Sequence, residues 1–356
     1  MATTDSRTEE GDQARAEEGD QDRAEKRAEQ VPGGEAERPT DIPPKGWLQV
    51  VKRGWKEAKA DQVPLLSAGV AYYAFLALFP ALIAVVSIYG LIADPGTIAA
   101  HISALGKALP GAARQLITEQ VTMLASKRAT LGLGAILAIF IALFSASGGM
   151  SNLITAINVA YDEQEKRNFL KKRLLALALT LAAIVFMVIM LGLVAVLPPL
   201  LKGFVGNGVL RWVLQIVGYL VLFAIVAAAL AVLYRLAPDR DGAEFRWVSV
   251  GALVATTIWL VASIGFSVYT ATLGNYAKTY GVFAGVVILL FWLWLTSYAI
   301  LLGAEINAEA EGQTVADTTK GPEEPLGQRG AVKADTLPPD EPEKPAKDRS
   351  TEKEQA

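Results

Sequence analysis

The sequence contains no cysteine and only one histidine, His101. The lack of cysteine excludes disulfides, iron–sulfur ligation and cysteine nucleophiles. One histidine cannot supply the cluster of histidine, cysteine and carboxylate ligands that zinc enzymes and metal-dependent nucleases use. We therefore expect no metal, no cofactor and no catalytic residues, and we predict that the protein is not an enzyme.

Large apolar side chains are scarce at both ends of the chain. Residues 1–43 consist mainly of Glu, Asp, Arg, Gln, Gly and Ala, and residues 311–356 are rich in Glu, Pro and Lys. Segments of this composition cannot bury a core, so we predict that both tails are disordered. The first tail also lacks the apolar region and cleavage site of a signal peptide, and the first membrane span is expected to act as an uncleaved insertion signal.

The apolar residues gather between these tails. Hydrophobic residues make up 52% of the chain, and the mean hydropathy is +0.34 in spite of the charged ends. Crossing the hydrocarbon core of a bilayer takes about 20 residues of helix. Runs of this length lie at about 65–92, 131–160, 174–197, 209–236, 248–271 and 282–304. The sequence thus predicts an all-α, polytopic membrane helix bundle with about six transmembrane helices, which occupies residues 44–310.

A basic amphipathic segment, residues 45–59, precedes the first span. Its apolar and basic side chains alternate at helical spacing, which predicts an amphipathic helix on the membrane surface. An ordinary basic flank that sets the topology would give the same pattern. Basic residues are denser in this flank and after the second and fourth spans than in the other connections. By the positive-inside rule, we predict that both termini are cytoplasmic.

Polar side chains interrupt the spans. The first span carries two adjacent tyrosines, and the second carries serine, threonine and asparagine at helical spacing, so that they share one face. Two interpretations remain open: hydrogen bonds between packed helices, or the lining of a substrate path. The candidate path residues are Tyr72, Tyr73, Ser147, Ser151, Asn152, Asn158 and Tyr280.

Four charged residues are expected to meet at one face of the membrane, because each stands at the end of a span. They are Asp61, Asp162, Arg235 and Glu305. A charge next to hydrocarbon needs a partner, so we hypothesise that Arg235 pairs with Glu305 or Asp162 and closes the cytoplasmic end of the bundle. The pair would be either a static link between helix ends or a gate that binds a headgroup.

Five segments resemble a known family. They are AGVAYYAFLALFPAL (68–82), SNLITAINVAYD (151–162), LYRLAPD (233–239), YGVFAGVVILLFWLWL (280–295) and LLGAEINA (301–308). Together they resemble the YihY/virulence factor BrkB family of bacterial inner-membrane proteins, from about residue 61 to residue 308. The resemblance implies a helical, multi-pass protein of the bacterial plasma membrane. Family members have been labelled ribonuclease BN with a role in transfer-RNA processing, whereas others are linked to serum resistance, envelope integrity and transport of envelope components.

The leading hypothesis is a transporter or translocator of a lipid or another envelope amphiphile. The candidate path residues would bind its headgroup, and Arg235 and Glu305 would control its cytoplasmic exit. A non-catalytic scaffold whose tails recruit envelope proteins is the alternative. Ribonuclease activity is the second alternative, and it conflicts with the missing metal ligands. The expected partners are membrane lipids, and no nucleic acid is expected because the basic residues form no groove interleaved with aromatic side chains.

Overall fold

The computed structural model describes residues 24–90, 133–204, 208–272 and 282–336. Its main helices are α2 (Pro44–Ala60), α3 (Val63–Gly90), α6 (Leu133–Ala160), α7 (Phe169–Phe204), α8 (Val209–Leu236), α9 (Phe245–Thr272) and α11 (Val282–Glu311), preceded by the short 3-10 helix η1 (Pro39–Asp41). Six of them, from α3 onward, are long and apolar enough to cross a membrane. The predicted all-α, polytopic class is confirmed.

One predicted boundary is wrong. We expected the third span to end before Pro198, but α7 continues through Pro198 and Pro199 to Phe204. Proline removes a backbone hydrogen bond without always ending a helix, and spans tolerate it better than soluble helices do.

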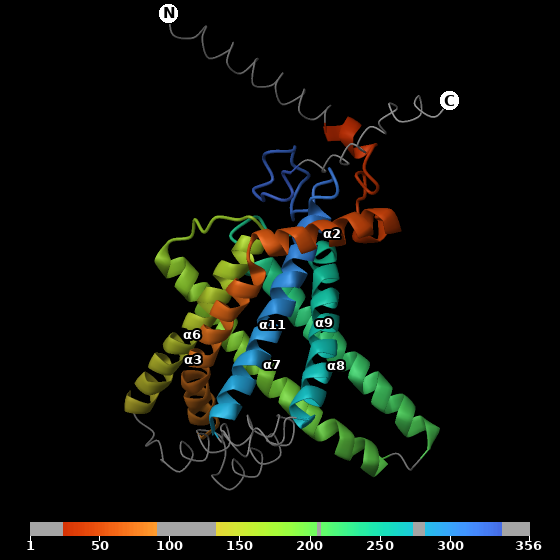
Figure 1. Cartoon of the computed structure of the whole chain (residues 1–356). Helices are drawn as coiled ribbons and strands as arrows, with labels where there is room; N and C mark the ends of the chain where they lie inside the picture. Colours follow the sequence, from red (N-terminus) through yellow and green to blue (C-terminus); the bar gives the residue numbers. More distant parts are fainter. Residues whose placement is uncertain (1–23, 91–132, 205–207, 273–281, 337–356) are drawn as a thin grey trace, which may run out of the picture.

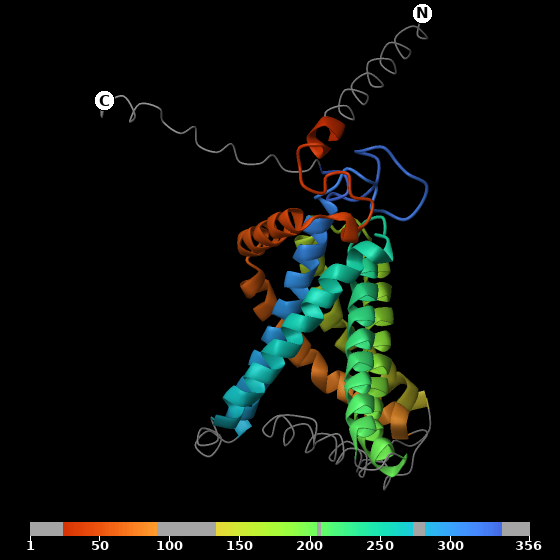
Figure 2. The ribbon, with the colours of Figure 1, turned by 90° about the vertical axis from the view of Figure 1, so that its right-hand side faces the viewer.

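Helix α2 lies across one end of the bundle, roughly perpendicular to the spans (Figures 1 and 2). Prolines at its start suit the first helical turn, and Gln62, with a φ of 53°, turns the chain from α2 into α3. The buried side of α2 is a stripe of Gly46, Val50, Gly54 and Ala58 at four-residue spacing. Its apolar side chains Leu48, Val51 and Trp55 stay exposed, as a helix at a membrane surface requires.

The spans converge at the end of the bundle where α2 lies, which we call the α2 end, and diverge toward the opposite end (Figures 1 and 2). The main cluster of buried side chains lies near the α2 end and includes Val63, Ile157, Ala176, Tyr234, Val248 and Leu301. In contrast, no side chain that the structure describes between residues 209 and 226 of α8 is buried. Packing is therefore tight at one end and loose at the other within the described ranges.

Glycine sets the closest helix crossing near the α2 end. A Cβ added to Gly251 of α9 would lie 2.0 Å from the carbonyl oxygen of Gly303 in α11, so only glycine fits there. Asn307 stabilises the same helix crossing. Its Oδ1 accepts a 2.6 Å hydrogen bond from the Gly251 amide, and its Nδ2 donates to the Val248 carbonyl at 3.1 Å. Backbone contact and polar bonds together fix α9 against α11.

Parts of both predicted tails are folded. Residues 24–43 and 312–336 pack on the α2 end, where the Thr314 hydroxyl donates to the carbonyl oxygens of Gly34 (3.1 Å) and Ala36 (2.9 Å). The Arg329 guanidinium donates to the carbonyl oxygens of Val315, Glu324 and Ala334. Polar and backbone hydrogen bonds hold these parts against the bundle, and such bonds leave no signal in apolar composition. Residues 1–23 and 337–356 lie outside the described ranges.

Candidate functional site

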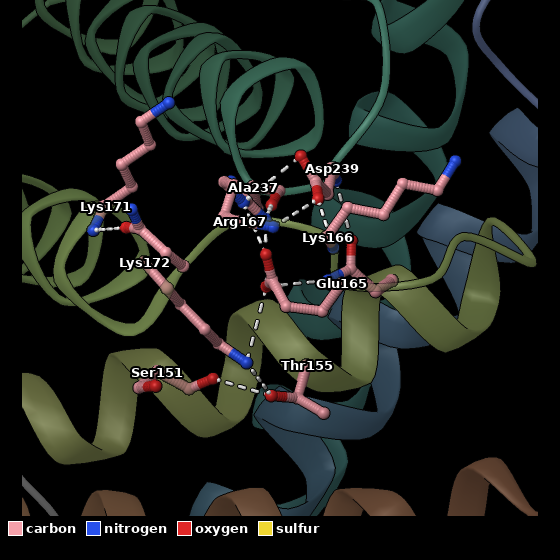
Figure 3. A network of polar contacts seen from close by, with 11 residues as sticks. Ser151, Thr155, Glu165, Lys166, Arg167, Lys171, Lys172, Ala237 and Asp239 are labelled. Carbon is pink, nitrogen blue, oxygen red and sulfur yellow. Dashed lines mark hydrogen bonds and ion pairs between the residues drawn. The ribbon is translucent and has the colours of Figure 1, made fainter.

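The connection from α6 to α7 carries the first of three charged networks at the α2 end. Glu165 lies between Arg167 and Lys172 (Figure 3), with 2.7 Å from the Arg167 Nε to its Oε1 and 3.4 Å from the Lys172 Nζ to its Oε2. Arg167 also binds Asp239 at 3.4 Å, after the end of α8. Burial alone would raise the pKa of Glu165, but the hydrogen bond and charge of Arg167, together with Lys172, lower it.

Asn158 joins this network to the end of α6. Its Nδ2 donates to Glu165 Oε2 at 3.1 Å, and its Oδ1 accepts the Asp239 backbone amide at 2.8 Å. The side chain is 2% exposed. An amide that uses both its donor and its acceptor in this way fixes the α6–α7 and α8–α9 connections to each other.

The second network is a buried ion pair between Arg240 and Glu311. The distance from the Arg240 Nη2 to the Glu311 Oε2 is 2.6 Å, and the two side chains are 2% and 0% exposed. The hydroxyl of Thr318 donates to the same carboxylate oxygen at 3.0 Å. Thr318 belongs to residues 312–336, which we call the C-terminal segment. Burial opposes the charge of Arg240, yet the carboxylate of Glu311 raises the Arg240 pKa, so the guanidinium stays charged.

The third network contains Lys333 of the C-terminal segment. Its ammonium lies 2.8 Å from the carboxylates of both Asp162 and Glu309. Arg53 of α2 binds the other oxygen of Glu309 at 2.6 Å and donates to Gln313 at 2.7 Å. The network thus links α2, the α6–α7 connection, α11 and the C-terminal segment.

Three of the four predicted charged residues lie in this third network. Asp162 binds Lys333 directly, and Asp61 and Glu305 are electrostatic neighbours of each other and of Lys333. Arg235 is elsewhere, because its guanidinium lies 4.2 Å from the ring centroid of Phe245 in a cation–π contact. The hypothesis that Arg235 pairs with Glu305 or Asp162 was wrong: it treated the C-terminal segment as disordered and so could not include Lys333.

A double-mutant cycle tests this reassignment. We expect the effects of Arg235→Ala and Glu305→Ala on the free energy of unfolding to add within about 0.5 kcal/mol, because the two side chains share no partner. In a parallel cycle, Lys333→Ala and Glu309→Ala should couple by at least about 1 kcal/mol, as expected for a partly buried ion pair. A coupling of that size between Arg235 and Glu305 would contradict the structure.

The candidate path residues of α6 bond mostly to their own helix. The Ser147 hydroxyl donates to the Phe144 carbonyl at 2.7 Å and the Asn152 amide donates to the Gly148 carbonyl at 2.8 Å, whereas the Ser151 carbonyl accepts the Thr155 hydroxyl at 3.0 Å. Such bonds satisfy polar groups inside a span without a second helix.

The tyrosines of α3 are different, since Tyr72 and Tyr73 are 54% and 45% exposed. Their rings meet edge to face with centroids 5.4 Å apart. Tyr280 lies outside the described residues.

Several functional candidates escaped the sequence analysis. They are Arg53, Glu165, Arg167, Asp239, Arg240, Glu309, Glu311 and Lys333. The spacing of Glu305 and Glu309 by one helical turn at the end of an apolar span was an available signal. Within the described ranges, no group of three or more acidic, histidine or cysteine side chains is arranged to hold a metal ion.

Comparisons with known proteins identify the family. Residues 55–327 match the family described as virulence factor BrkB. The putative ribonuclease-like protein YfkH of Bacillus subtilis is 34% identical over 255 residues, which cover 68% of this chain and 88% of that protein. A UPF0761 membrane protein of Tolumonas auensis is 38% identical over 78 residues, which cover 21% of this chain and 25% of that protein. A UPF0761 membrane protein of Rhodospirillum centenum is 33% identical over 111 residues, which cover 30% of this chain and 24% of that protein. No solved structure matches the chain. Together with the six candidate spans of the described residues, this match establishes the predicted resemblance: the chain belongs to the virulence factor BrkB family of integral membrane proteins.

Proposed function

We propose that this protein translocates a lipid or another envelope amphiphile across the plasma membrane, with the α2 end in the cytoplasm. The observation that carries the proposal is the difference between the two ends of the bundle. Alternating-access transporters close one end of a helix bundle while the other is open. Within the described ranges, the tight α2 end and the diverging opposite end correspond to such a state.

The α2 end has the chemistry of a closed gate. Buried pairs such as Arg240 with Glu311 exclude water and join elements that are distant in the sequence. Charges are costly near hydrocarbon unless they are paired, so such networks form where a bundle must stay sealed but still be able to open. The networks of Glu165 and Lys333 close the same end from two other sides.

Toward the opposite end, the spans present exposed surfaces. Val209, Trp212 and Phe283 are 80%, 71% and 78% exposed, and a Cβ added to Gly192 or Gly265 would meet no atom within 4 Å. Apolar faces of this kind accept acyl chains. The exposed residues Tyr72 and Tyr73, in the half of α3 nearer the α2 end, add hydroxyl groups that suit a headgroup. A molecule with both an acyl part and a polar part therefore fits these surfaces better than a small ion does.

The basic residues support the orientation. Lys52, Lys56 and Lys59 lie on α2, and Lys166 and Arg167 lie in the α6–α7 connection at the same end. Positively charged flanks stay on the cytoplasmic side. The exposed apolar face of α2, with cations beside it, suits anionic headgroups of the inner leaflet.

Reconstitution in liposomes tests the proposal. We expect the purified protein to accelerate movement of labelled anionic phospholipid between leaflets. The double variant Tyr72→Phe/Tyr73→Phe should be at least about fivefold slower, because each lost hydroxyl forfeits about 1 kcal/mol of hydrogen bonding. Tyr219→Phe removes a hydroxyl from an exposed tyrosine of α8 and serves as the matched control, with a rate like that of the wild type.

One outcome would contradict translocation, and a second would show that the cellular role depends on the tails. No acceleration with either anionic or zwitterionic phospholipid would remove the lipid as substrate. Loss of function in cells on deletion of residues 1–23 and 337–356, with lipid movement unchanged in liposomes, would favour the scaffold. The name of the Bacillus subtilis relative says ribonuclease-like, and transfer-RNA precursor can be added to the same preparation to measure cleavage, which we do not expect.

A further inference from the structure

Two carboxyl groups meet at the α2 end without a cation between them. Asp61 ends α2 and Glu305 lies on α11, and the two carboxyl groups are close electrostatic neighbours. Two ionised carboxylates are acceptors only and repel each other, so these groups can hydrogen-bond to each other only when one of them carries a proton. We propose that Asp61 and Glu305 form a proton-binding site, in which the two carboxyl groups share one exchangeable proton.

The burial of Glu305 favours the shared proton. The residue is 1% exposed, and its Oε1 is buried without a hydrogen-bond partner among the described residues. An ionised carboxylate in that position would leave a charged oxygen with neither water nor a donor, which is among the costliest arrangements in a protein. A protonated carboxyl group leaves only a neutral carbonyl oxygen there.

The cationic side chains near Asp61 and Glu305 form ion pairs with other carboxylates. The charged groups that face the pair are Glu57, Asp162, Glu309 and Lys333. Lys333 divides its ammonium between Asp162 and Glu309 at 2.8 Å each, and Arg53 binds the far side of Glu309. Acidic groups therefore outnumber cationic groups around Asp61 and Glu305, and the local net charge is negative. A bound proton is the simplest cation that reduces this negative charge.

The site can exchange its proton with solution. Asp61 is half-buried and is followed by the exposed Gln62 at the turn into α3. Burial first, and then the charges of Asp162 and Glu57, raise the pKa of Asp61 above that of an exposed aspartate. Loss of the proton would place two negative charges between α2 and α11, where Gly54 packs against Ile306. Proton release thus weakens the contact of α2 with the bundle.

The pH dependence of stability tests the site, and its sign follows from linkage. A carboxyl group whose pKa is raised by folding binds its proton more tightly in the folded protein, so stability falls as pH rises above the unfolded value of about 4. For one proton, the folding equilibrium constant should fall by up to about tenfold per pH unit until the pair has lost it. The full-length protein in detergent, denatured between about pH 5 and pH 8, should show this fall.

Variants assign the proton. Glu305→Gln keeps the shape and a hydrogen-bond donor but has no titratable group, so its stability should lose this pH dependence. Glu57→Gln, which removes a neighbouring carboxylate, is the matched control and should keep it. Infrared spectroscopy should detect a protonated carboxyl group in the wild type and in Glu57→Gln but not in Glu305→Gln. Asp61→Asn provides the same comparison if Glu305→Gln fails to fold.

Either of two results would overturn the proposal. The first concerns the infrared band of the protonated carboxyl group. The proposal fails if the wild type lacks this band, or if the band persists unchanged in both Glu305→Gln and Asp61→Asn. The second concerns salt at constant pH. If sodium chloride stabilised the wild type but choline chloride did not, and Glu305→Gln showed no such difference, the ligand would be a metal ion. Both measurements are independent of whether the protein moves lipids.

Discussion

Arg240→Ala is expected to lower the free energy of unfolding by about 3–5 kcal/mol, because it leaves the carboxylate of Glu311 buried without its partner. The two side chains are almost fully buried at a distance of 2.6 Å, so water cannot replace the guanidinium. Reversible unfolding in mixed detergent micelles measures the loss.

A double variant separates charge from packing. Arg240→Met/Glu311→Leu removes both charges and keeps the volume, and it should recover most of the lost stability, since a buried pair contributes little beyond an apolar replacement. Arg246→Ala is the control, because it breaks the exposed ion pair with Glu244 and should change stability by at most about 1 kcal/mol. An Arg240→Ala effect as small as that of Arg246→Ala would show that the pair is not buried in solution.

Gly251→Ala is expected to have the second large effect. Its added methyl group would lie 2.0 Å from the Gly303 carbonyl oxygen and 2.5 Å from the Asn307 side chain, and the first of these neighbours is backbone that cannot rotate away. Overpacking costs about 1–3 kcal/mol where side chains can adjust, so we expect at least about 3 kcal/mol here. The measurements are the same unfolding assay and the yield of monodisperse protein.

Gly265→Ala is the matched control for this crossing. Gly265 lies in the same helix, α9, but a Cβ there meets no atom within 4 Å. Replacing glycine by alanine in an open helical position stabilises the helix by up to about 1 kcal/mol. If Gly251→Ala caused no loss of stability either, α9 and α11 would not cross as closely as they do in this structure.

The spans were predictable because their signal is local. Six long apolar runs stand out from charged ends, and the length of each is set by the thickness of the bilayer. The amphipathic helix α2 followed from the spacing of its apolar and basic side chains alone. These features require no knowledge of which helix packs against which.

The charged networks were not predictable in the same way. The partners of Glu309 are Arg53 and Lys333, which lie far from it in the sequence on opposite sides, and periodicity carries no information on such pairs. Arg235 was assigned a partner because it ends a span, although an aromatic ring, Phe245, was within reach. The bonds of Ser147 and Asn152 to their own helix likewise look identical in sequence to bonds between helices.

The contacts of Arg53 have a consequence for biosynthesis. Arg53 enters the nascent chain before the first span, whereas its partners Glu309 and Gln313 belong to the end of the last span and the segment after it. During translation this cation therefore has no partner until the last span and the segment after it have left the ribosome. A chain truncated before residue 309 lacks both partners, so the α2 end of an unfinished copy has none of the Arg53 contacts to Glu309 and Gln313 that a chain extending past them has.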